Sequence, residues 1–403
     1  MINCHFQIRS PSEASTGRRH QNMIRFLLIY LSVYPLVHYY LFRKIRAALT
    51  LGRKAKTGIF LFMAVMIAAP IVVRLAEGAG METGAKFLAY TSFSWMGLLF
   101  LFITLAATVD VGRFIILAAG KIQQRKFVQA KVSPRHLLTI QVILVVAVYG
   151  YGLFEAADIR LEHIHITSPK ITEETGTIRI AQISDVHLGL IVRKERLKRI
   201  LARINEERPD ILVSTGDLVD GQLNHLITEA GLLAAIKPPL GKFAITGNHE
   251  FYAGLPDALD FTKKSGFTML RDQGIVIGGI NIVGVDDLAV KSLGTRDTES
   301  ELDLLLAQPK GNFTLLLKHR PDVNQNDMGL FDLQLSGHTH KGQIFPFNLL
   351  TWFFFPQHAG QLTRLKSGFL YLNRGTGTWG PPIRFLAPPE VTIIDLIPEK
   401  RMK

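Results

Sequence analysis

Four long apolar runs lie within the first 154 residues, at 24–42, 58–73, 87–109 and 137–154. A helix needs about 20 apolar residues to cross the roughly 30 Å hydrocarbon core of a bilayer. The third run is long enough, and the first and fourth are close to the lower limit. The second is short, so Lys56 and Arg74 at its ends would have to reach toward the headgroups. The pattern predicts about four transmembrane helices, with the stretch 111–120 continuing the third helix or lying at the interface.

The pattern changes after residue 154, where short apolar runs alternate with segments whose apolar residues recur about every 3.6 positions. The expected strands read TIRIAQISD, DILVSTGD, GKFAITGNHE, INIVGVDD, FTLLLKHRP and DLQLSGHTH, and the expected helices KERLKRILARINEE, LITEAGLLAAI and ESELDLLLAQ. Such alternation is typical of an α/β fold in which helices cover the sheets. We therefore expect a membrane domain at 1–154, a linker at 155–176 and a folded α/β domain at 177–403.

Charge divides the chain at the same place. Residues 155–403 contain 28 Lys and Arg against 29 Asp and Glu, although the whole chain has a net charge of +13. The excess positive charge therefore lies entirely in the first 154 residues, between the apolar runs. These basic clusters also argue against a buried helical bundle. A nucleic-acid enzyme would carry such charge on its folded domain, so we expect no nucleic-acid partner.

The basic residues also predict an orientation, because cytoplasmic loops of membrane proteins are enriched in Lys and Arg. The loops 43–57 and 110–135 contain twelve, whereas the segments on the opposite side contain seven. This distribution predicts an integral protein of the bacterial inner membrane whose α/β domain faces away from the cytoplasm. The single cysteine, Cys4, does not argue for either side.

Polar residues with metal-binding side chains follow five of the expected strands. In the stretch ISDVHLG, Asp185 and His187 stand two residues apart and would point to the same side if the chain stayed extended. Ligands in open α/β folds gather beyond the carboxyl ends of the strands. The residues at these ends are Asp185, His187, Asp217, Asn248, His249, His319, His338 and His340. Independent capping residues would not recur in this way at one strand end after another.

The side-chain types indicate a metal centre. Carboxylate, amide oxygen and imidazole, without thiolate, suit Mn, Fe or Zn in a reactive site rather than a structural zinc finger. The ligands outnumber what one ion takes from a protein, so two divalent ions sharing a bridging carboxylate are expected. Paired ions clamp a phosphoryl group and lower the pKa of bound water. The sequence therefore predicts hydrolysis of a phosphoester or pyrophosphate.

The five blocks D-x-H, G-D-x-x-D, G-N-H-E, a lone H and G-H-x-H, spread over 177–396, resemble the calcineurin-like metallophosphoesterases. The run NRGTGTWGPPIRFLAPPEVTII is similar to their membrane-associated branch, which includes YkuE-like proteins and transmembrane proteins with a metallophosphoesterase domain. The resemblance implies a four-layer α/β sandwich of two sheets. It also implies a set of roles: Asp185, His187 and His340 on one ion, Asn248, His319 and His338 on the other, Asp217 bridging both, and His249 protonating the leaving oxygen.

For residues beside the expected ligands, the sequence gives weaker indications of a role. Asp220 and Glu250 are expected to orient a ligand or a loop rather than to bind metal. Arg374, in a glycine-rich loop, is a candidate contact for a substrate phosphate. Lys341 follows GHTH where the membrane-associated branch usually has glycine, and its ammonium would add positive charge toward the substrate.

We expect a membrane-anchored phosphoesterase acting on a phosphodiester, phosphomonoester or pyrophosphate, with lipids among the candidate substrates. One alternative is a UDP-2,3-diacylglucosamine pyrophosphatase of lipid A synthesis, which would require the α/β domain to face the cytoplasm. Another is a scaffold with a phosphoesterase-like fold and no turnover. A scaffold would be expected to have lost ligands, and every expected ligand is present in this sequence.

Overall fold

The structure is a computed structural model that describes residues 11–399 except 125–131, 222, 224 and 294–300. The chain divides into two compact units. The helical unit comprises Phe26–Ala156 and Trp379–Phe385. The sheet unit comprises Ala157–Thr378 and Leu386–Lys403, together with Met1–Arg25.

Long helices make up most of the helical unit: α1 (Pro11–Ala48), which belongs to it from Phe26 onward, α2 (Arg53–Gly78), α3 (Glu82–Ile122) and α4 (Pro134–Ala157). Within the described residues, α2, α3 and α4 have the length and apolar composition needed to cross a membrane. The stretch 111–120 lies inside α3. The first apolar run lies inside α1, which is not among the three, so the fourth span stays a prediction.

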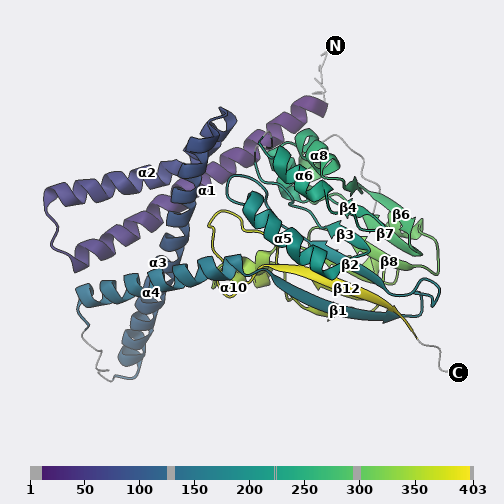
Figure 1. The fold of residues 1–403 in the computed structure, drawn as a ribbon. Helices are drawn as coiled ribbons and strands as arrows, with labels where there is room; N and C mark the ends of the chain where they lie inside the picture. Colours follow the sequence, from purple (N-terminus) through teal and green to yellow (C-terminus); the bar gives the residue numbers. More distant parts are fainter. Residues whose placement is uncertain (1–10, 125–131, 222, 224, 294–300, 400–403) are drawn as a thin grey trace, which may run out of the picture. The chain divides into compact units, whose positions relative to one another are not determined.

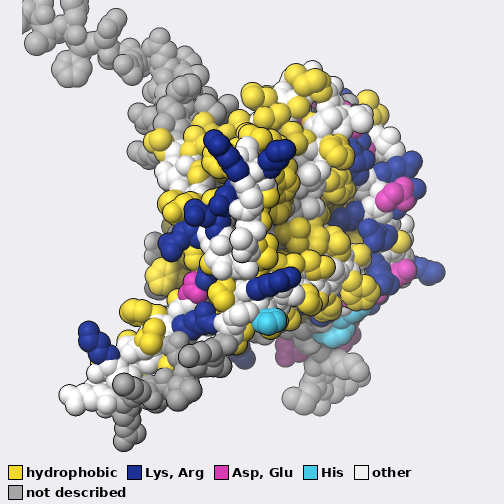
Figure 2. Space-filling model, turned by 90° about the vertical axis from the view of Figure 1, so that its left-hand side faces the viewer, with side chains coloured by type: hydrophobic (Ala, Val, Ile, Leu, Met, Phe, Trp, Pro, Cys, Tyr) yellow, Lys and Arg dark blue, Asp and Glu magenta, His cyan; other side chains and the backbone are white. Residues whose placement is uncertain are grey.

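A cluster of polar side chains joins two helices of the helical unit. The Lys44 ammonium lies 2.6 Å from the Asp110 carboxylate, and the Tyr40 hydroxyl donates to the same group at 2.7 Å, which joins α1 to α3. Many large apolar side chains remain on the surface, including Phe60, Phe87 and Phe114, which are 65%, 75% and 71% exposed. Figure 2 shows a face on which hydrophobic and basic side chains predominate. Exposed apolar surface of this extent is suited to hydrocarbon rather than water.

The short stretch Trp379–Phe385 joins the helical unit although it is distant from it in sequence. The Arg384 amide donates to the Gly152 carbonyl of α4 at 3.0 Å, and the Phe385 ring packs edge-on against Tyr151 at 6.2 Å. This stretch contains the WGPPIRF letters of the run that resembles the membrane-associated branch. Its role within the helical unit is therefore to pack against α4.

Two six-stranded sheets form the sheet unit (Figure 1). The first has the order β1-β12-β2-β3-β4-β5, with β1 (Arg160–Ser168), β12 (Glu390–Pro398), β2 (Ile178–Ile183), β3 (Ile211–Ser214), β4 (Lys242–Ala244) and β5 (Thr268–Met269). The second has the order β10-β11-β9-β8-β7-β6, with β10 (Leu362–Arg364), β11 (Phe369–Leu372), β9 (Leu333–Ser336), β8 (Phe313–Leu317), β7 (Ile280–Gly284) and β6 (Gln273–Ile277). All six strands expected from the sequence are present.

Strand β1 lies inside the stretch 155–176 that the sequence analysis treats as a linker. It pairs in parallel with β12 along its whole length, from Arg160 opposite Glu390 to Ser168 opposite Pro398. Its partner strand is more than 200 residues away in sequence, so local pattern alone does not reveal the pairing. The helical unit and the first sheet are thus separated in sequence by only a few residues.

The layers stack in the expected order. Apolar side chains of both sheets fill the space between them, among them Ile180, Val213, Leu315 and Leu335. The outer face of the first sheet is covered by α5 (Lys194–Glu207), α6 (Ile227–Ala234) and α8 (Leu255–Lys264). The outer face of the second packs against α9 (Glu301–Leu306). The prediction of a four-layer α/β sandwich is confirmed.

Candidate metal centre

The expected ligands come from loops that follow parallel strands of both sheets. In the first sheet β2, β3 and β4 run parallel, and in the second β8 and β9 do. Asp185 and His187 follow β2, Asp217 follows β3, and Asn248 begins the short helix α7 (Asn248–Ala253) after β4. His319 follows β8, and His338 and His340 follow β9. Parallel strands present their carboxyl ends at one edge of a sheet, which is why these residues meet.

The ligand loops do not stay extended, and the geometry assumed for Asp185 and His187 is wrong in that respect. Their φ angles are 50° and 54°, and Asp217, His338 and His340 also have positive φ, at 51°, 74° and 49°. Residues other than glycine rarely adopt this left-handed conformation, which costs on the order of 1–3 kcal/mol and clusters at active sites. The side chains therefore converge through tight turns rather than through strand alternation.

One group of expected ligands combines residues from both sheets: Asp185 and His187 follow β2 of the first sheet, and His340 follows β9 of the second. His187 Nε2 lies 3.0 Å from His340 Nε2, and His340 Nε2 lies 3.4 Å from Asp185 Oδ1. The ligand atoms of these three residues all lie within 4.8 Å of one another. Two imidazole nitrogens facing each other at 3.0 Å, beside a carboxylate, form a suitable site for a cation.

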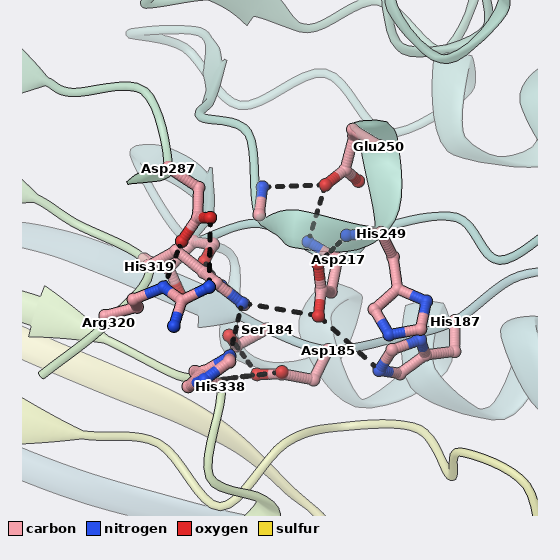
Figure 3. A network of polar contacts seen from close by, with 12 residues as sticks. Ser184, Asp185, His187, Asp217, His249, Glu250, Asp287, His319, Arg320 and His338 are labelled. Atoms are coloured by element: carbon pink, nitrogen blue, oxygen red, sulfur yellow. Dashed lines mark hydrogen bonds and ion pairs between the residues drawn. The ribbon is translucent and has the colours of Figure 1, made fainter. Parts of the chain in front are cut away.

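A second group of expected ligands consists of Asp217, His319 and His338 (Figure 3). Asp217 Oδ2 lies 3.3 Å from His319 Nε2 and 3.9 Å from His187 Nε2. His319 Nε2 is in turn 3.2 Å from His338 Nδ1. The Asp217 carboxylate thus faces ligand atoms of both groups, as a bridging ligand must.

The buried polar atoms test whether the residues fit two ions. Asn248 Oδ1 is buried and has no hydrogen-bond partner among the described residues. An orphaned buried amide oxygen is costly, and a cation removes that cost. The His319 Nδ1–H donates to the Thr215 carbonyl at 2.8 Å, which orients the ring so that Nε2 faces Asp217. Both features fit a metal centre.

The expected ligands differ in charge. Burial acts to lower the pKa of His319, but the Asp217 carboxylate outweighs burial and raises that pKa to about 10. Burial lowers the pKa of His187 and of His338 to about 3, so both imidazoles are neutral and able to bind metal. Burial raises the pKa of Asp185 to about 6. Burial also acts to raise the pKa of Asp217, but His319 and His249 outweigh it and hold that pKa well below its usual range.

Glu250 connects two of the ligand loops. Its Oε2 accepts hydrogen bonds from the amides of Asp217 and Gly247 at 3.0 and 2.7 Å, and its Oε1 accepts from Leu218 N at 2.7 Å. Burial and the Asp217 charge raise its pKa to about 7, while the amide donors act in the opposite direction. A Cβ on Gly247 would overlap the Asp217 carboxylate, so glycine is required there. Glu250 therefore orients the loops, as the sequence indicated.

His249 lies beside the ligands and contacts a further carboxylate. Its Nδ1 is 3.1 Å from Asp220 Oδ1, and its ring packs edge-on against the His187 ring at 4.5 Å. Burial lowers the pKa of His249, but Asp217 and Asp220 outweigh burial and raise it to about 9. The contact assigns Asp220 the orienting position expected from the sequence.

The two substrate-binding candidates have different surroundings. Arg374 is 7% exposed and forms ion pairs with Glu162 of β1 and Glu390 of β12. Its guanidinium is paired with these two carboxylates, and its contact with a substrate phosphate stays a prediction. Lys341 follows His340 directly, has a φ of 50°, and lines a cavity described below.

Sequence reasoning missed several residues that support the site. The Ser184 hydroxyl donates to Asp185 Oδ2 at 2.5 Å, and Thr215 accepts from His319 as described. Arg320 Nε donates to Asp287 at 2.7 Å next to His319 (Figure 3). Asp287 ends the expected strand INIVGVDD, so the rule of polar residues at strand ends would have found it.

Comparison with known proteins gives consistent matches. Residues 178–342 match the model of the calcineurin-like phosphoesterase family. An uncharacterized metallophosphoesterase of Aquifex aeolicus is 39% identical over 251 residues, which cover 61% of this chain and 95% of that protein. A transmembrane protein with metallophosphoesterase domain from Danio rerio is 30% identical over 342 residues, covering 78% of this chain and 75% of that protein.

A third relative is the uncharacterized metallophosphoesterase YkuE of Bacillus subtilis, 35% identical over 263 residues that cover 62% of this chain and 89% of that protein. These matches confirm the resemblance that the five motif blocks indicated. The similarity extends over nearly the whole of the Aquifex protein. The chain is therefore a member of the calcineurin-like metallophosphoesterase family.

Proposed function

We propose that this chain is a phosphoester hydrolase that holds two divalent ions, drawn from Mn, Fe and Zn. The observation that carries the proposal is the position of Asp217, whose carboxylate faces His187 of one ligand group and His319 of the other. In this proposal Asp185, His187 and His340 hold one ion, Asn248, His319 and His338 hold the other, and Asp217 contacts both. Divalent ions there supply Lewis-acid activation of a phosphoryl group and of water.

The protein's own groups supply position and protons. The left-handed loops and the Glu250 hydrogen bonds fix the ligands before substrate binds, so little reorganisation is needed. His249, held by Asp220, donates a proton to the leaving oxygen of the ester. A scaffold without turnover would not need this proton donor or a complete ligand set.

We further propose that the enzyme is membrane-anchored, with the sheet unit on the side of the membrane away from the cytoplasm. In the part of the chain that the structure describes, three helices are suited to crossing a bilayer, and the Danio rerio relative is named as a transmembrane protein. The distribution of Lys and Arg in the loops supports the orientation. A pyrophosphatase acting on a nucleotide-linked lipid precursor would need the opposite orientation, so topology separates these two functions.

The test of the two-metal proposal is Asp217→Asn in the full-length protein. We expect loss of most bound metal, measured by mass spectrometry, and loss of hydrolysis of phosphodiesters and phosphomonoesters with Mn, Fe or Zn. The fold should persist because the strands do not depend on this side chain. Asp332→Asn is the matched control, since Asp332 contacts Lys170 and the Thr314 amide rather than any ligand. Two metal equivalents with near-normal turnover in Asp217→Asn would contradict the proposal.

A further inference from the structure

The helix α10 (Phe347–Phe354), after the last ligand motif, leaves its apolar side chains in the open. No residue of α10 is buried. Leu349, Trp352, Phe353 and Phe354 are 60%, 55%, 76% and 66% exposed. The stretch 342–363 around it contains no Lys, Arg, Asp or Glu. Contiguous exposed apolar surface of this kind marks a binding site rather than an ordinary protein surface.

Helix α10 is attached directly to the ligand loop. A Cβ on Gly342, which has a φ of 74°, would overlap the backbone at Asn348 in the first turn of the helix. The Phe347 amide donates to the Ile344 carbonyl at 2.9 Å. The loop that carries His338 and His340 and the apolar helix are thus packed backbone to backbone.

A cavity of about 320 Å³ lies between this loop and the helix. Its wall includes Thr339 and Lys341 from the ligand loop, and Leu349, Trp352 and Phe355 from α10 and its end. The Phe355 ring packs edge-on against the His338 ring at 5.5 Å, so the apolar wall reaches a proposed metal ligand. The volume lies within the range of small-molecule sites. The rest of the wall is formed by Asn348, Thr351, Gln357, His358, Ala359 and Gln361. Apolar side chains therefore form one part of the cavity, and Lys341 lies in the part next to the ligand loop.

We infer that this cavity binds the alkyl or acyl chain of an amphiphilic phosphoester whose phosphate lies at the metal centre. The inference rests on the proposed function and names its substrate class. The Lys341 ammonium contributes positive charge on the phosphate side, and Leu349, Trp352 and Phe355 contact the chain. Docking of α10 onto the bilayer itself is less suitable, because interfacial helices carry Lys and Arg on their polar face and this stretch has none.

The first test measures chain-length dependence. Full-length protein in phosphatidylcholine nanodiscs would be assayed with methyl, butyl and octyl 4-nitrophenyl phosphodiesters below their aggregation concentrations. We expect kcat/KM to rise by up to about fourfold per methylene until the cavity is filled. Trp352→Ala should lower the octyl-to-methyl ratio of kcat/KM by about tenfold or more. Phe353→Ala, on the same helix but outside the cavity, should keep that ratio. Hydrolysis of all three esters with no chain-length preference would overturn the inference and leave the proposed function intact.

The second test detects binding without turnover. The chain has three tryptophans, so Trp95→Phe with Trp379→Phe leaves Trp352 as the only one. A bromine-labelled alkyl phosphonate should quench Trp352 fluorescence saturably, and an unlabelled one should reverse the effect. Quenching in a protein that hydrolyses none of the esters would support the chain site while the proposed function fails. Lack of quenching by the phosphonate would overturn the inference. Equal quenching by brominated bilayer lipids alone would also overturn it, because α10 would then lie in the bilayer.

Discussion

Glu250→Gln is the sharpest test of how the ligand loops are held. The carboxylate accepts three backbone hydrogen bonds, two at Oε2 from Asp217 N and Gly247 N, and one at Oε1 from Leu218 N. Glutamine has nearly the same shape. With its amide oxygen at the Oε2 position it keeps two bonds, but its NH₂ group then faces the Leu218 N–H, and two donors cannot pair.

The expected loss of stability follows from the single hydrogen bond that glutamine cannot make. One buried N–H left without an acceptor costs about 1–3 kcal/mol. For a domain of this size each kcal/mol lowers the unfolding midpoint by about 2–4 °C, so Glu250→Gln should unfold about 2–12 °C earlier. The Asp217 backbone moves with the lost constraint, so we also expect the variant to bind less metal than the wild type.

The assay compares thermal unfolding of the sheet unit and metal content at pH 8. Glu229→Gln is the matched control, because Glu229 is also buried but accepts from the Lys194 amide and from Arg193 rather than from the amides of Asp217, Leu218 or Gly247. We expect the control to lose stability but to keep its metal. Unchanged stability and unchanged metal content in Glu250→Gln would refute the role assigned to the three hydrogen bonds.

Three further predictions concern the proton donor, a buried lysine and topology. His249→Ala should keep its metals but slow the hydrolysis of alkyl esters by about 10²–10⁴. Hydrolysis of 4-nitrophenyl esters should slow much less, because nitrophenolate leaves without needing a proton. An equal loss of rate with both kinds of ester would argue against proton donation. Lys242 Nζ donates to the carbonyls of Leu233 and Ser265 at 2.7 Å each, so Lys242→Met should cost about 2–4 kcal/mol in thermal or denaturant unfolding. Burial lowers the pKa of Lys242 from 10.5 to about 8. Between these pH values the unfolded chain binds more protons than the folded chain, so the stability of the wild type should increase as the pH rises. Lys242→Met should lack this increase. A reporter active only after export should be active when fused after Lys403, and one active only in the cytoplasm should be active at Thr50; the inverted pattern would favour the nucleotide-linked lipid pyrophosphatase.

The sequence alone determined which side chains of metal-binding type follow the strands, and in what order along the chain. Each ligand follows an apolar run that forms a strand, and that signal is local, since it needs only the run and the polar residues after it. The helix KERLKRILARINEE coincides with α5 for the same reason. The apolar runs in the first 154 residues are equally local, because a bilayer selects for length and composition.

Only the tertiary structure decided what depends on residues far apart in sequence. The packing of two sheets brings His319 and His338 to Asp217, and left-handed turns rather than extended strands aim the side chains. The ion pairs of Arg374 with Glu390 and with Glu162, which is 212 residues away, also appear only in the folded chain, and its phosphate contact stays a prediction. The pairing of β1 with β12 and the exposure of α10 beside the ligand loop are of the same kind. Ion pairing, sheet pairing and exposure depend on which distant groups become neighbours, and a local pattern of polar and apolar residues does not contain that information.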